Sequence, residues 1–542
     1  MKPRTFIAAL LLAPLAALSA DTRPAPKPPL NILFIITDQQ RWDAMSCAGN
    51  GILQTPNLDK LARDGARFTN FYSACPVCVP ARTAILTGHS IESNHVVDNK
   101  DVDKTDAPPF PSFDQILLRS GYHGEYHGKY HSPYALALEY TQPVSWLNGK
   151  KAPPKSKAVT SESEAFRAYL EKNVPARPLR PGELLQANGI YTSIELDERF
   201  GKPDAAKGSQ AESYGRLEVP AEHSHAAYTA KEGIAALDRL KGGPFTLTIS
   251  IDPPHPPMIV SEPYYSMYPP QGIPAPASIS DPRTNSPYAD RPGEGVLYRQ
   301  PQLIKQMTSI YYGMVREVDD WIGKILQRVD DLGLADNTLI IFTSDHGEML
   351  GDHGMHGKFV FYEGSVHVPL LMRLPGAIKP GTVIKAPASH IDLFPTILDY
   401  CGKTDNESEG RSLRPLIDGI DPGTNRVAVS EWPATRVPGF MICDGRWKLL
   451  YGRAANAPSL DALYDLQTDP QELNNLIGKN PQREQSRTEV TRMKGLLVEW
   501  LIRVKSPHLE SVRARPIFAD ASSVAGKAET SGQPKAKKKA AK

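Results

Sequence analysis

The sequence predicts an α/β protein in which helices flank a doubly wound mixed sheet, followed by a smaller C-terminal α+β domain built on an antiparallel sheet. Two observations support this prediction. Short apolar segments recur with the length and composition of strands that are buried on both faces; they are residues Asn31–Thr37, Phe245–Ile251, 338–343 and 368–374. Segments with helical periodicity separate them, and this alternation is typical of a sheet covered by helices on both faces.

The segments between these strands carry the end signals and the spacing of helices. Thr55 and Ser112 are the expected N-caps of two short helices. Longer helices are predicted over residues 226–240 and 302–332. In the second of these, apolar side chains recur every three or four residues and would bury one face; they are Ile310, Met314, Val318, Trp321, Ile325 and Val329.

The C-terminal part of the chain has a different pattern. Three short segments predict the antiparallel sheet; they are residues 427–430, 439–443 and Trp447–Tyr451. A last helix is expected over residues 487–504. We therefore predict a main domain over residues 30–420 and a smaller one over residues 421–515. Residues 516–542 are rich in alanine, serine and lysine and are expected to be disordered.

The N-terminus has the pattern of a secretory signal peptide. Lys2 and Arg4 precede an apolar run over residues 6–18, and small residues follow it. We expect residues 1–20 to be this signal and residues 21–29 to be a proline-rich leader. The apolar run is too short to span a membrane, and no other segment has that length. The sequence therefore predicts a chain exported to the periplasm or the extracellular space, without a membrane span in the mature protein.

The overall composition is that of a globular protein. The chain has 542 residues, a formal net charge of +2, 40% apolar and 23% charged residues, and it is long enough for more than one core. The balanced charge gives no reason to expect nucleic acid as a partner. Five cysteines are too few for a disulfide framework. Nothing in the sequence fixes an oligomeric state.

The segment that begins at Cys75 and reads CPVCVPARTAILTG carries the strongest chemical signal. Pro80 suits the first turn of a helix. Cys78 is therefore expected at a helix N-terminus, where free N–H groups and the helix dipole favour an anion. Arg82 adds a cation one turn further on. This arrangement predicts a site for a sulfate or phosphate group, or for a nucleophile that attacks one.

This segment resembles the C-x-P-x-R signature of the type I sulfatases, which belong to the alkaline-phosphatase-like superfamily. In that family a formylglycine-generating enzyme converts the cysteine to formylglycine, whose hydrated aldehyde is the nucleophile. The resemblance assigns this role to Cys78, because Val77 and Val79 stand where Cys75 would need the proline and the arginine. The alternative is a redox or zinc half-site at Cys75-x-x-Cys78, but no second cysteine pair or Cys/His cluster stands at zinc spacing.

The resemblance extends over about residues 31–476, where further pieces match the family's motifs in the family's order. They are Asp38-Gln39, Gly128-Lys129-Tyr130-His131, Pro254-His255-Pro256, Asp345-His346-Gly347 and Gly357-Lys358. Several of these pieces follow a predicted buried strand. Because the carboxyl ends of strands in a doubly wound sheet meet at one edge, we expect these side chains to surround Cys78.

The resemblance also implies a divalent cation. Its ligands would be Asp38, Gln39, Asp345 and His346, where the family often has Asp-Asp and Asp-Asn pairs. Oxygen-rich sites suit Ca²⁺, which is the first expectation, with Mg²⁺ or Mn²⁺ as alternatives because an amide and an imidazole lower the charge and hardness of the site.

The remaining motif residues have catalytic roles by resemblance. Arg82 would hold the nucleophile by charge-assisted hydrogen bonds. Lys129, His255 and Lys358 would surround the sulfate and offset developing charge. His255 or Lys358 would give a proton to the leaving alcohol, and His131 would accept the proton of the second hydroxyl as sulfate leaves.

A sulfated carbohydrate is the expected substrate, because an exported enzyme can reach polymers that are too large to import. Two irregular insertions, over residues 132–219 and 264–303, would widen the cleft. Tyrosines in the second one are expected to stack on sugar rings; they are Tyr264, Tyr265, Tyr268, Tyr288 and Tyr298. For three other histidines a structural role is at least as well supported as a catalytic one; they are His353, His356 and His367.

Other functions fit parts of the same pattern. Phosphonate monoester hydrolases and phosphodiesterases of this superfamily share the cysteine-derived nucleophile and an Asp-Gln metal pair. Choline sulfatase and arylsulfatase activities would use the same residues on smaller substrates. A non-catalytic carbohydrate-binding relative would require a broken signature, and every element of this one is intact.

Overall fold

The computed structural model describes residues 28–518 apart from short gaps. The gaps are residues 104–107, 138, 142–143, 147–158, 179, 181–182, 186–190, 195–213, 290–296, 406, 421–422, 424–425, 434–436 and 458. The predicted signal peptide, most of the leader and nearly all of the predicted disordered tail lie outside the described residues. Within the described part of the chain, no helix combines the length and the apolar character that a membrane span requires.

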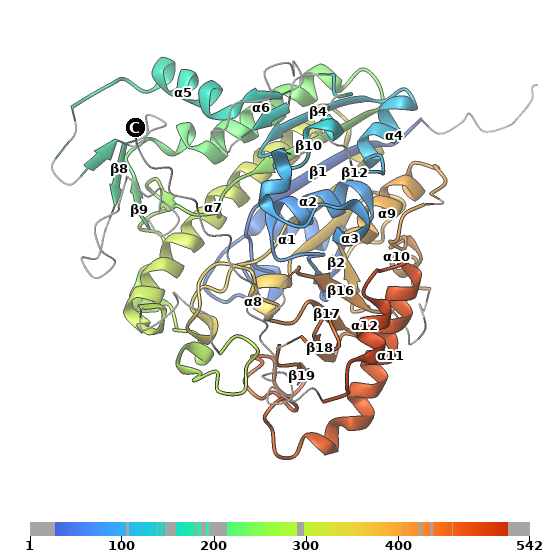
Figure 1. Ribbon diagram of the computed structural model, residues 1–542. Helices are drawn as coiled ribbons and strands as arrows, with labels where there is room; N and C mark the ends of the chain where they lie inside the picture. Colours follow the sequence, from blue (N-terminus) through green and yellow to red (C-terminus); the bar gives the residue numbers. More distant parts are fainter. Residues whose placement is uncertain are drawn as a thin grey trace, which may run out of the picture.

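The main sheet has seven strands in the order β14-β2-β13-β12-β1-β10-β4 (Figure 1). Their bounds are Asn31–Thr37 (β1), Ala66–Phe68 (β2), His123–Gly128 (β4), Phe245–Ile251 (β10), Thr338–Ser344 (β12), Leu370–Arg373 (β13) and Thr382–Ile384 (β14). The strands β4, β10, β1 and β12 run parallel, whereas β13 is antiparallel to both of its neighbours. The predicted mixed sheet is confirmed, and all four predicted strands belong to it.

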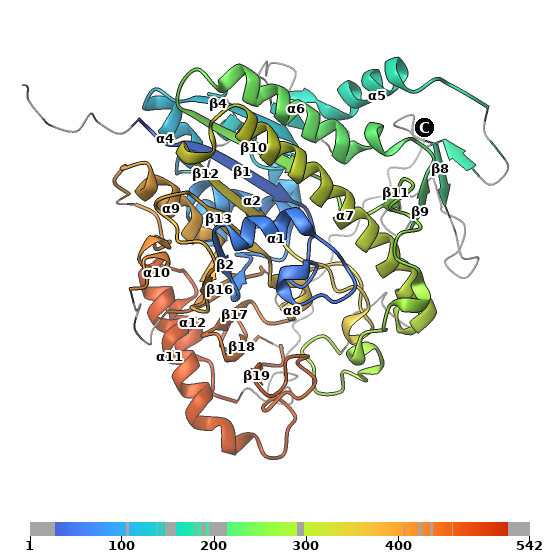
Figure 2. The same cartoon turned by 180° about the vertical axis from the view of Figure 1, so that it is seen from behind.

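Helices cover both faces of this sheet. Successive residues of a strand point to opposite faces, so Phe34 packs under one layer and Leu33 under the other. The first layer contains α2 (Cys78–Thr87), α4 (Phe113–Arg119) and α9 (Leu393–Tyr400). The second contains α1 (Pro56–Arg63), α6 (His225–Leu240) and α7 (Pro301–Asp331), which Figure 2 shows from behind. Ser112 caps α4 as predicted, but the Thr55 hydroxyl accepts a hydrogen bond from the Ser46 amide instead of capping α1.

The C-terminal sheet is antiparallel, in the order β16-β17-β18-β19. Its strands are Ala428–Glu431 (β16), Phe440–Cys443 (β17), Trp447–Tyr451 (β18) and Ala462–Asp465 (β19); the sequence analysis did not predict the last of these. One face packs against α11 (Arg487–Arg503) and α12 (Leu509–Ala514). The other face packs directly on the main body, where Met441 and Tyr464 share an apolar cluster with Tyr72 and Tyr362. The two parts therefore share a core.

Smaller elements complete the described chain. The helices are α3 (Ile91–Asn94), α5 (Glu162–Asn173), α8 (Glu363–Val366) and α10 (Arg414–Ile417). The strands are β3 (Phe71–Tyr72), β5 (Val144–Trp146), β6 (Val159–Ser161), β7 (Glu183–Leu185), β8 (Tyr191–Ile194), β9 (Tyr214–Leu217), β11 (Met258–Val260) and β15 (Ala388–Ser389). The predicted insertion over residues 132–219 contributes β5 to β9 and α5, and much of the rest of it lies outside the described residues.

Candidate active site

Three neighbouring parallel strands deliver carboxylates to one edge of the main sheet. Asp38 follows β1 in the centre, Asp252 follows β10 on one side, and Asp345 follows β12 on the other. Asp38 and Asp345 are fully buried. This is the convergence at the carboxyl ends of the strands that the sequence predicted. The sequence analysis did not assign Asp252 a role, although its position after a buried strand matches that of Asp38.

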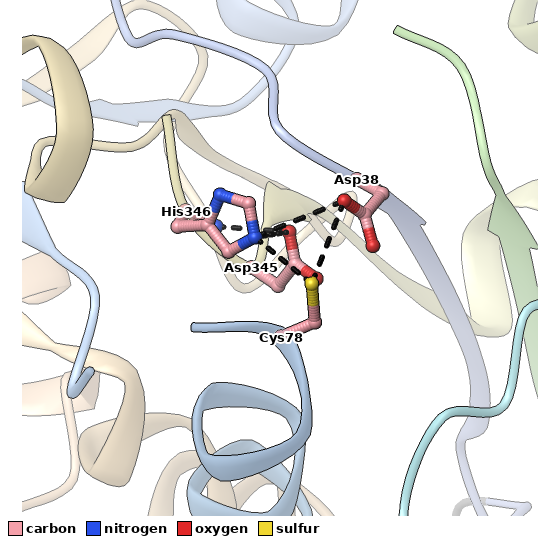
Figure 3. Close-up of side chains that lie close together, drawn as sticks. All are labelled: Asp38, Cys78, Asp345 and His346. Carbon is pink, nitrogen blue, oxygen red and sulfur yellow. Dashed lines mark hydrogen bonds and ion pairs between the residues drawn. The ribbon is translucent and has the colours of Figure 1, made fainter. Parts of the chain in front are cut away.

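Four buried side chains form the centre of the site (Figure 3). The ligand atoms of Asp38, Cys78, Asp345 and His346 all lie within 4.8 Å of one another. The Nε2 atom of His346 is 3.8 Å from Asp38 Oδ1 and 3.6 Å from Asp345 Oδ1. Its Nδ1 atom lies 3.0 Å from the carbonyl of Gly347, which can only accept a hydrogen bond. Nδ1 therefore carries a proton, and this hydrogen bond fixes the ring with Nε2 toward the cluster.

Gln39 adds an amide oxygen to this centre. Its backbone lies in the left-handed region, with φ 69°, and its N–H donates to Asp345 Oδ1 at 3.1 Å. Its side-chain nitrogen donates to buried Glu348, so the amide oxygen faces the cluster, 3.0 Å from Lys358 Nζ. Burial raises the pKa of Glu348, but His356 and two backbone amides lower it to about 2. Glu348 is a positioning residue that the sequence analysis missed, although it stands two residues after His346.

The donor set fits a hard divalent cation. It combines two carboxylates, one amide oxygen and one imidazole nitrogen, which are common ligands of such ions. Two of these ligand atoms already face a positive charge. The Lys358 ammonium donates to Gln39 Oε1 and lies 3.0 Å from His346 Nε2. Burial alone would raise the pKa of Asp38, but the neighbouring cations, Lys129 foremost, hold it well below its ordinary value. The residues present are thus suited to hold a metal ion.

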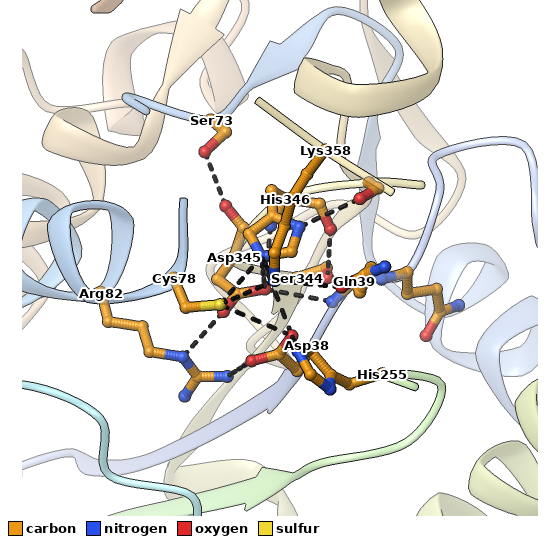
Figure 4. A network of polar contacts seen from close by, with 12 residues as sticks. Asp38, Gln39, Ser73, Cys78, Arg82, His255, Ser344, Asp345, His346 and Lys358 are labelled. Atoms are coloured by element: carbon orange, nitrogen blue, oxygen red, sulfur yellow. Dashed lines mark hydrogen bonds and ion pairs between the residues drawn. The ribbon is translucent and has the colours of Figure 1, made fainter. Parts of the chain in front are cut away.

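Cys78 is the first residue of α2, as the sequence predicted. Its Sγ atom lies 2.9 Å from Lys358 Nζ, 3.2 Å from His346 Nε2 and 3.9 Å from Asp38 Oδ1 (Figure 4). Burial and the Asp38 charge oppose ionisation of this thiol. The cations around it, foremost Lys358, nevertheless hold the pKa of Cys78 well below its usual value. The side chain at this position is therefore in an environment that favours an anion.

Arg82 fixes the carboxylates. Its Nε donates to Asp345 Oδ2 at 2.8 Å, and one terminal nitrogen donates to Asp38 Oδ2 at 3.1 Å. The other terminal nitrogen donates to the Lys129 carbonyl and to the Ser250 hydroxyl. We expected Arg82 to hold the nucleophile directly. Its four hydrogen bonds instead go to the residues that follow β1 and β12, to β10 and to the loop after β4, and they use the planar shape of the guanidinium.

The remaining predicted residues also reach the site. Lys129 lies between two carboxylates, 2.8 Å from Asp38 Oδ2 and 3.0 Å from Asp252 Oδ1. His255 is further out, with Nε2 at 3.9 Å from Asp38 Oδ1. His131 is buried beside the Cys78 side chain, and burial lowers its pKa to about 4. The structure thus brings the ten predicted site residues, Cys78 among them, together in one site.

Two expectations about other residues have different outcomes. Tyr268, Tyr288 and Tyr298 are buried in apolar clusters, so the prediction that they stack on sugars is wrong for these three. The three histidines for which a structural role was at least as well supported as a catalytic one each pair with a carboxylate. His353 pairs with Asp281, His356 with Glu348 and His367 with Glu363.

Comparisons with known proteins agree with this geometry. A profile of the sulfatase family matches residues 30–403, and one of the C-terminal region of N-sulphoglucosamine sulphohydrolase matches residues 351–498. An N-acetylglucosamine-6-O-sulfatase of Bacteroides thetaiotaomicron is 29% identical over 528 residues, 86% of this chain and 87% of that protein. PehA, a multifunctional alkaline phosphatase superfamily protein of Trinickia caryophylli, is 29% identical over 491 residues, 83% of this chain and 91% of that one.

A solved structure shares the fold. The phosphonate monoester hydrolase of Agrobacterium radiobacter superposes with a TM-score of 0.68 at 26% identity, over 87% of this chain and 96% of the hydrolase. Fold and matches together define an enzyme of the alkaline-phosphatase-like superfamily. Within that superfamily the chain belongs to the sulfatase family and is a sulfuric ester hydrolase.

Proposed function

We propose that this protein is an exported sulfatase that removes sulfate esters from carbohydrates, with a formylglycine made from Cys78 as nucleophile. The observation that carries the proposal is the surroundings of the Cys78 Sγ atom. It lies at the N-terminus of α2, 2.9 Å from Lys358 Nζ and 3.2 Å from His346 Nε2, inside a buried cluster. A nucleophile there would meet a sulfate group amid cations and free helix N–H groups.

Asp38, Gln39, Asp345 and His346 would hold a divalent cation, with Ca²⁺ expected first and Mg²⁺ or Mn²⁺ as alternatives. Such an ion would polarise the sulfate oxygens and lower the pKa of the attacking hydroxyl. Arg82 keeps two of the ligand carboxylates oriented through its hydrogen bonds to both.

The other residues would manage charge and protons. Lys129 and Lys358 offset negative charge that develops on the sulfate. His255 or Lys358 gives a proton to the leaving alcohol oxygen as the sulfur–oxygen bond breaks. His131, which its low pKa keeps neutral at pH 7, accepts the proton of the second aldehyde-hydrate hydroxyl as sulfate leaves. One water is consumed in the cycle, and the ester yields an alcohol and sulfate.

The carbohydrate substrate is supported by a relative that matches 86% of the chain and is named as an N-acetylglucosamine-6-O-sulfatase. Export is supported by the signal-peptide pattern of residues 1–20. Cell fractionation with an antibody, and N-terminal sequencing of the mature protein, would test it. Recovery of an uncleaved chain in the cytoplasm would contradict export.

A second candidate is hydrolysis of phosphonate monoesters or phosphodiesters. The structural similarity to a phosphonate monoester hydrolase favours it. The purified enzyme should therefore be assayed on a sulfated N-acetylhexosamine, an aryl sulfate, choline sulfate, a phosphonate monoester and a phosphodiester. We expect the highest kcat/KM on the sulfated sugar. A phosphorus ester as the best substrate would favour the second candidate.

The same preparation should be examined for formylglycine. Peptide mass spectrometry of the segment around Cys78 is expected to show replacement of the sulfur by an aldehyde oxygen. An active enzyme with unmodified Cys78 would contradict the proposed nucleophile.

A further inference from the structure

An exposed aromatic residue directly follows one of the site lysines in the chain. Few large apolar residues are exposed among the described residues, and Phe359 is the aromatic one of them, with 38% of its surface accessible. It follows Lys358, whose Nζ atom contacts Cys78 Sγ, and its own N–H donates to the carbonyl of Pro76 at 3.3 Å. Phe359 is thus hydrogen-bonded to the loop before Cys78 and directly follows a proposed catalytic lysine in the chain.

The backbone at Phe359 has a conformation that large side chains rarely adopt. Its φ is 75°, in the left-handed region. Asparagine and aspartate are the residues other than glycine that adopt this region most readily, and a large aromatic residue is rare there. Lys358 before it and Val360 after it are buried, and only the ring between them is exposed. A strained backbone that exposes an apolar ring lowers stability, and such strain concentrates at ligand sites.

A second aromatic ring extends this surface. Trp432, which follows β16 of the C-terminal sheet, lies 5.6 Å from Phe359 between ring centroids, with the planes inclined by 55°. Trp432 also packs against the apolar cluster that contains Cys75 and Val77, two residues of the segment just before Cys78. The Trp432 ring therefore packs on the loop that precedes Cys78, and Phe359 is held beside this loop by its backbone hydrogen bond to Pro76 and by its ring contact with Trp432.

We propose that Phe359 and Trp432 form a platform at the active site that packs against the apolar face of the sugar ring bearing the sulfate ester. The proposal rests on the carbohydrate sulfatase function put forward above, and it names the part of the site that would select a ring over an acyclic alcohol. Sugars present C–H groups on their ring faces, and aromatic side chains supply a rigid apolar surface against them. In this proposal Phe359 and Trp432 have the sugar-binding role that the sequence analysis had assigned to tyrosines that are in fact buried.

The test compares variants of the full chain, produced together with a formylglycine-generating enzyme. Phe359→Asn removes the ring but retains a residue type that tolerates the left-handed backbone. Phe359→Tyr retains the ring. Trp432→Leu removes the second ring while leaving apolar packing against Val77. Ile502→Asn, at another exposed apolar side chain on α11, is the matched control. The fraction of formylglycine in each preparation is measured by mass spectrometry, and rates are expressed per converted enzyme.

Each variant is assayed on a sulfated N-acetylhexosamine and on an acyclic alkyl sulfate. We expect Phe359→Asn and Trp432→Leu to raise KM for the sugar about five- to ten-fold with little change in kcat. Their kcat/KM on the acyclic sulfate should stay within about two-fold of the wild type. Phe359→Tyr and Ile502→Asn should match the wild type on both substrates.

The outcomes separate the platform from the proposed function. If the wild type hydrolyses the sulfated sugar and Phe359→Asn leaves its KM unchanged, the platform is overturned while the carbohydrate sulfatase function stands. If both variants lose activity equally on the sugar and the acyclic sulfate, the rings support the nucleophile loop and the platform is again overturned. If the wild type hydrolyses no sulfated sugar, the proposed function itself fails, and the platform with it.

Discussion

The Nζ atom of Lys358 lies 2.9 Å from the Sγ atom of Cys78, although the two residues are 280 positions apart in the chain. Lys358 also contacts Gln39 Oε1 and His346 Nε2. One flexible cationic side chain therefore connects the position of the nucleophile with two of the proposed metal ligands.

The first prediction separates the two neighbouring cysteines. Cys78→Ala should abolish turnover without a large change in melting temperature, because it removes the proposed nucleophile and little apolar volume. Cys75→Ala should retain most of the activity, because Cys75 packs in an apolar cluster with Val77 and Ile91. Steady-state assays and thermal melting of both variants provide the measurement. Activity that survives in Cys78→Ala and disappears in Cys75→Ala would contradict the assignment of the signature.

The second prediction concerns the metal. Exhaustive chelation should remove activity, and a divalent cation should restore it. Asp345→Asn should reduce the bound metal measured by elemental analysis, because it removes one ligand charge at constant size. Asp281→Asn makes the same change at a partly buried carboxylate that pairs with His353 away from the site, and it should leave metal content unchanged. Full activity in a metal-free preparation would exclude the proposed role of the ion.

The third prediction concerns the shape of Arg82. Arg82→Lys keeps the charge but loses the fork that reaches both Asp345 and Asp38. We expect kcat/KM to fall by about 100-fold or more, since both ligand carboxylates lose their fixed orientation. Arg426→Lys is the matched control, because Arg426 is also buried and pairs with Asp392 outside the site. Equal losses of kcat/KM in the two variants would show that the effect is general destabilisation.

The fourth prediction concerns pH and Glu431, which is buried at the end of β16. Burial, with repulsion from Glu92 and Glu409, raises the pKa of this carboxyl to about 8. The folded state then holds a proton that the unfolded chain releases near pH 4.5. This contribution to stability is complete below that pH and is lost as pH rises toward 8.

Glu431→Gln should therefore flatten the loss of stability between pH 5 and pH 8, and should raise the melting temperature more at pH 8 than at pH 5. Glu510→Gln, at an exposed position on α12, should leave the pH profile unchanged. Parallel pH profiles for the wild type and Glu431→Gln would show that this carboxyl is not protonated in the folded protein.

The fold was largely predictable because its signals are local. The apolar runs at Asn31–Thr37 and Phe245–Ile251 are long enough to identify central strands, and the amphipathic pattern identified α7 within one residue at each end. The strand β19, Ala462–Asp465, was not predicted, although the equally short strands β16 and β17 were. The position of β19 depends on pairing with β18, which is a tertiary contact.

The site residues were predictable where a motif carried them, and less so elsewhere. Glu348 orients the Gln39 amide across 309 residues of chain, and no spacing in the sequence reveals that contact. The tyrosines of residues 264–303 were assigned to the surface because they lie in an irregular segment. Tyr288 is instead buried against Tyr362, which only the packing of the two sheets determines.

The burial of Cys78 has a consequence for the order of events during biosynthesis. The side chain is 1% exposed, and Lys358 and Trp432, which cover its loop, are synthesised hundreds of residues later. The maturing enzyme proposed above would need access to this cysteine and would therefore have to act before those segments fold over it. At about 5–20 residues per second, the 280 residues up to Lys358 leave an interval on the order of tens of seconds. In chains that fold before conversion, the Cys78 thiol would be buried and inaccessible to the maturing enzyme. The yield of active enzyme would therefore depend on the rate of modification relative to the rate of folding.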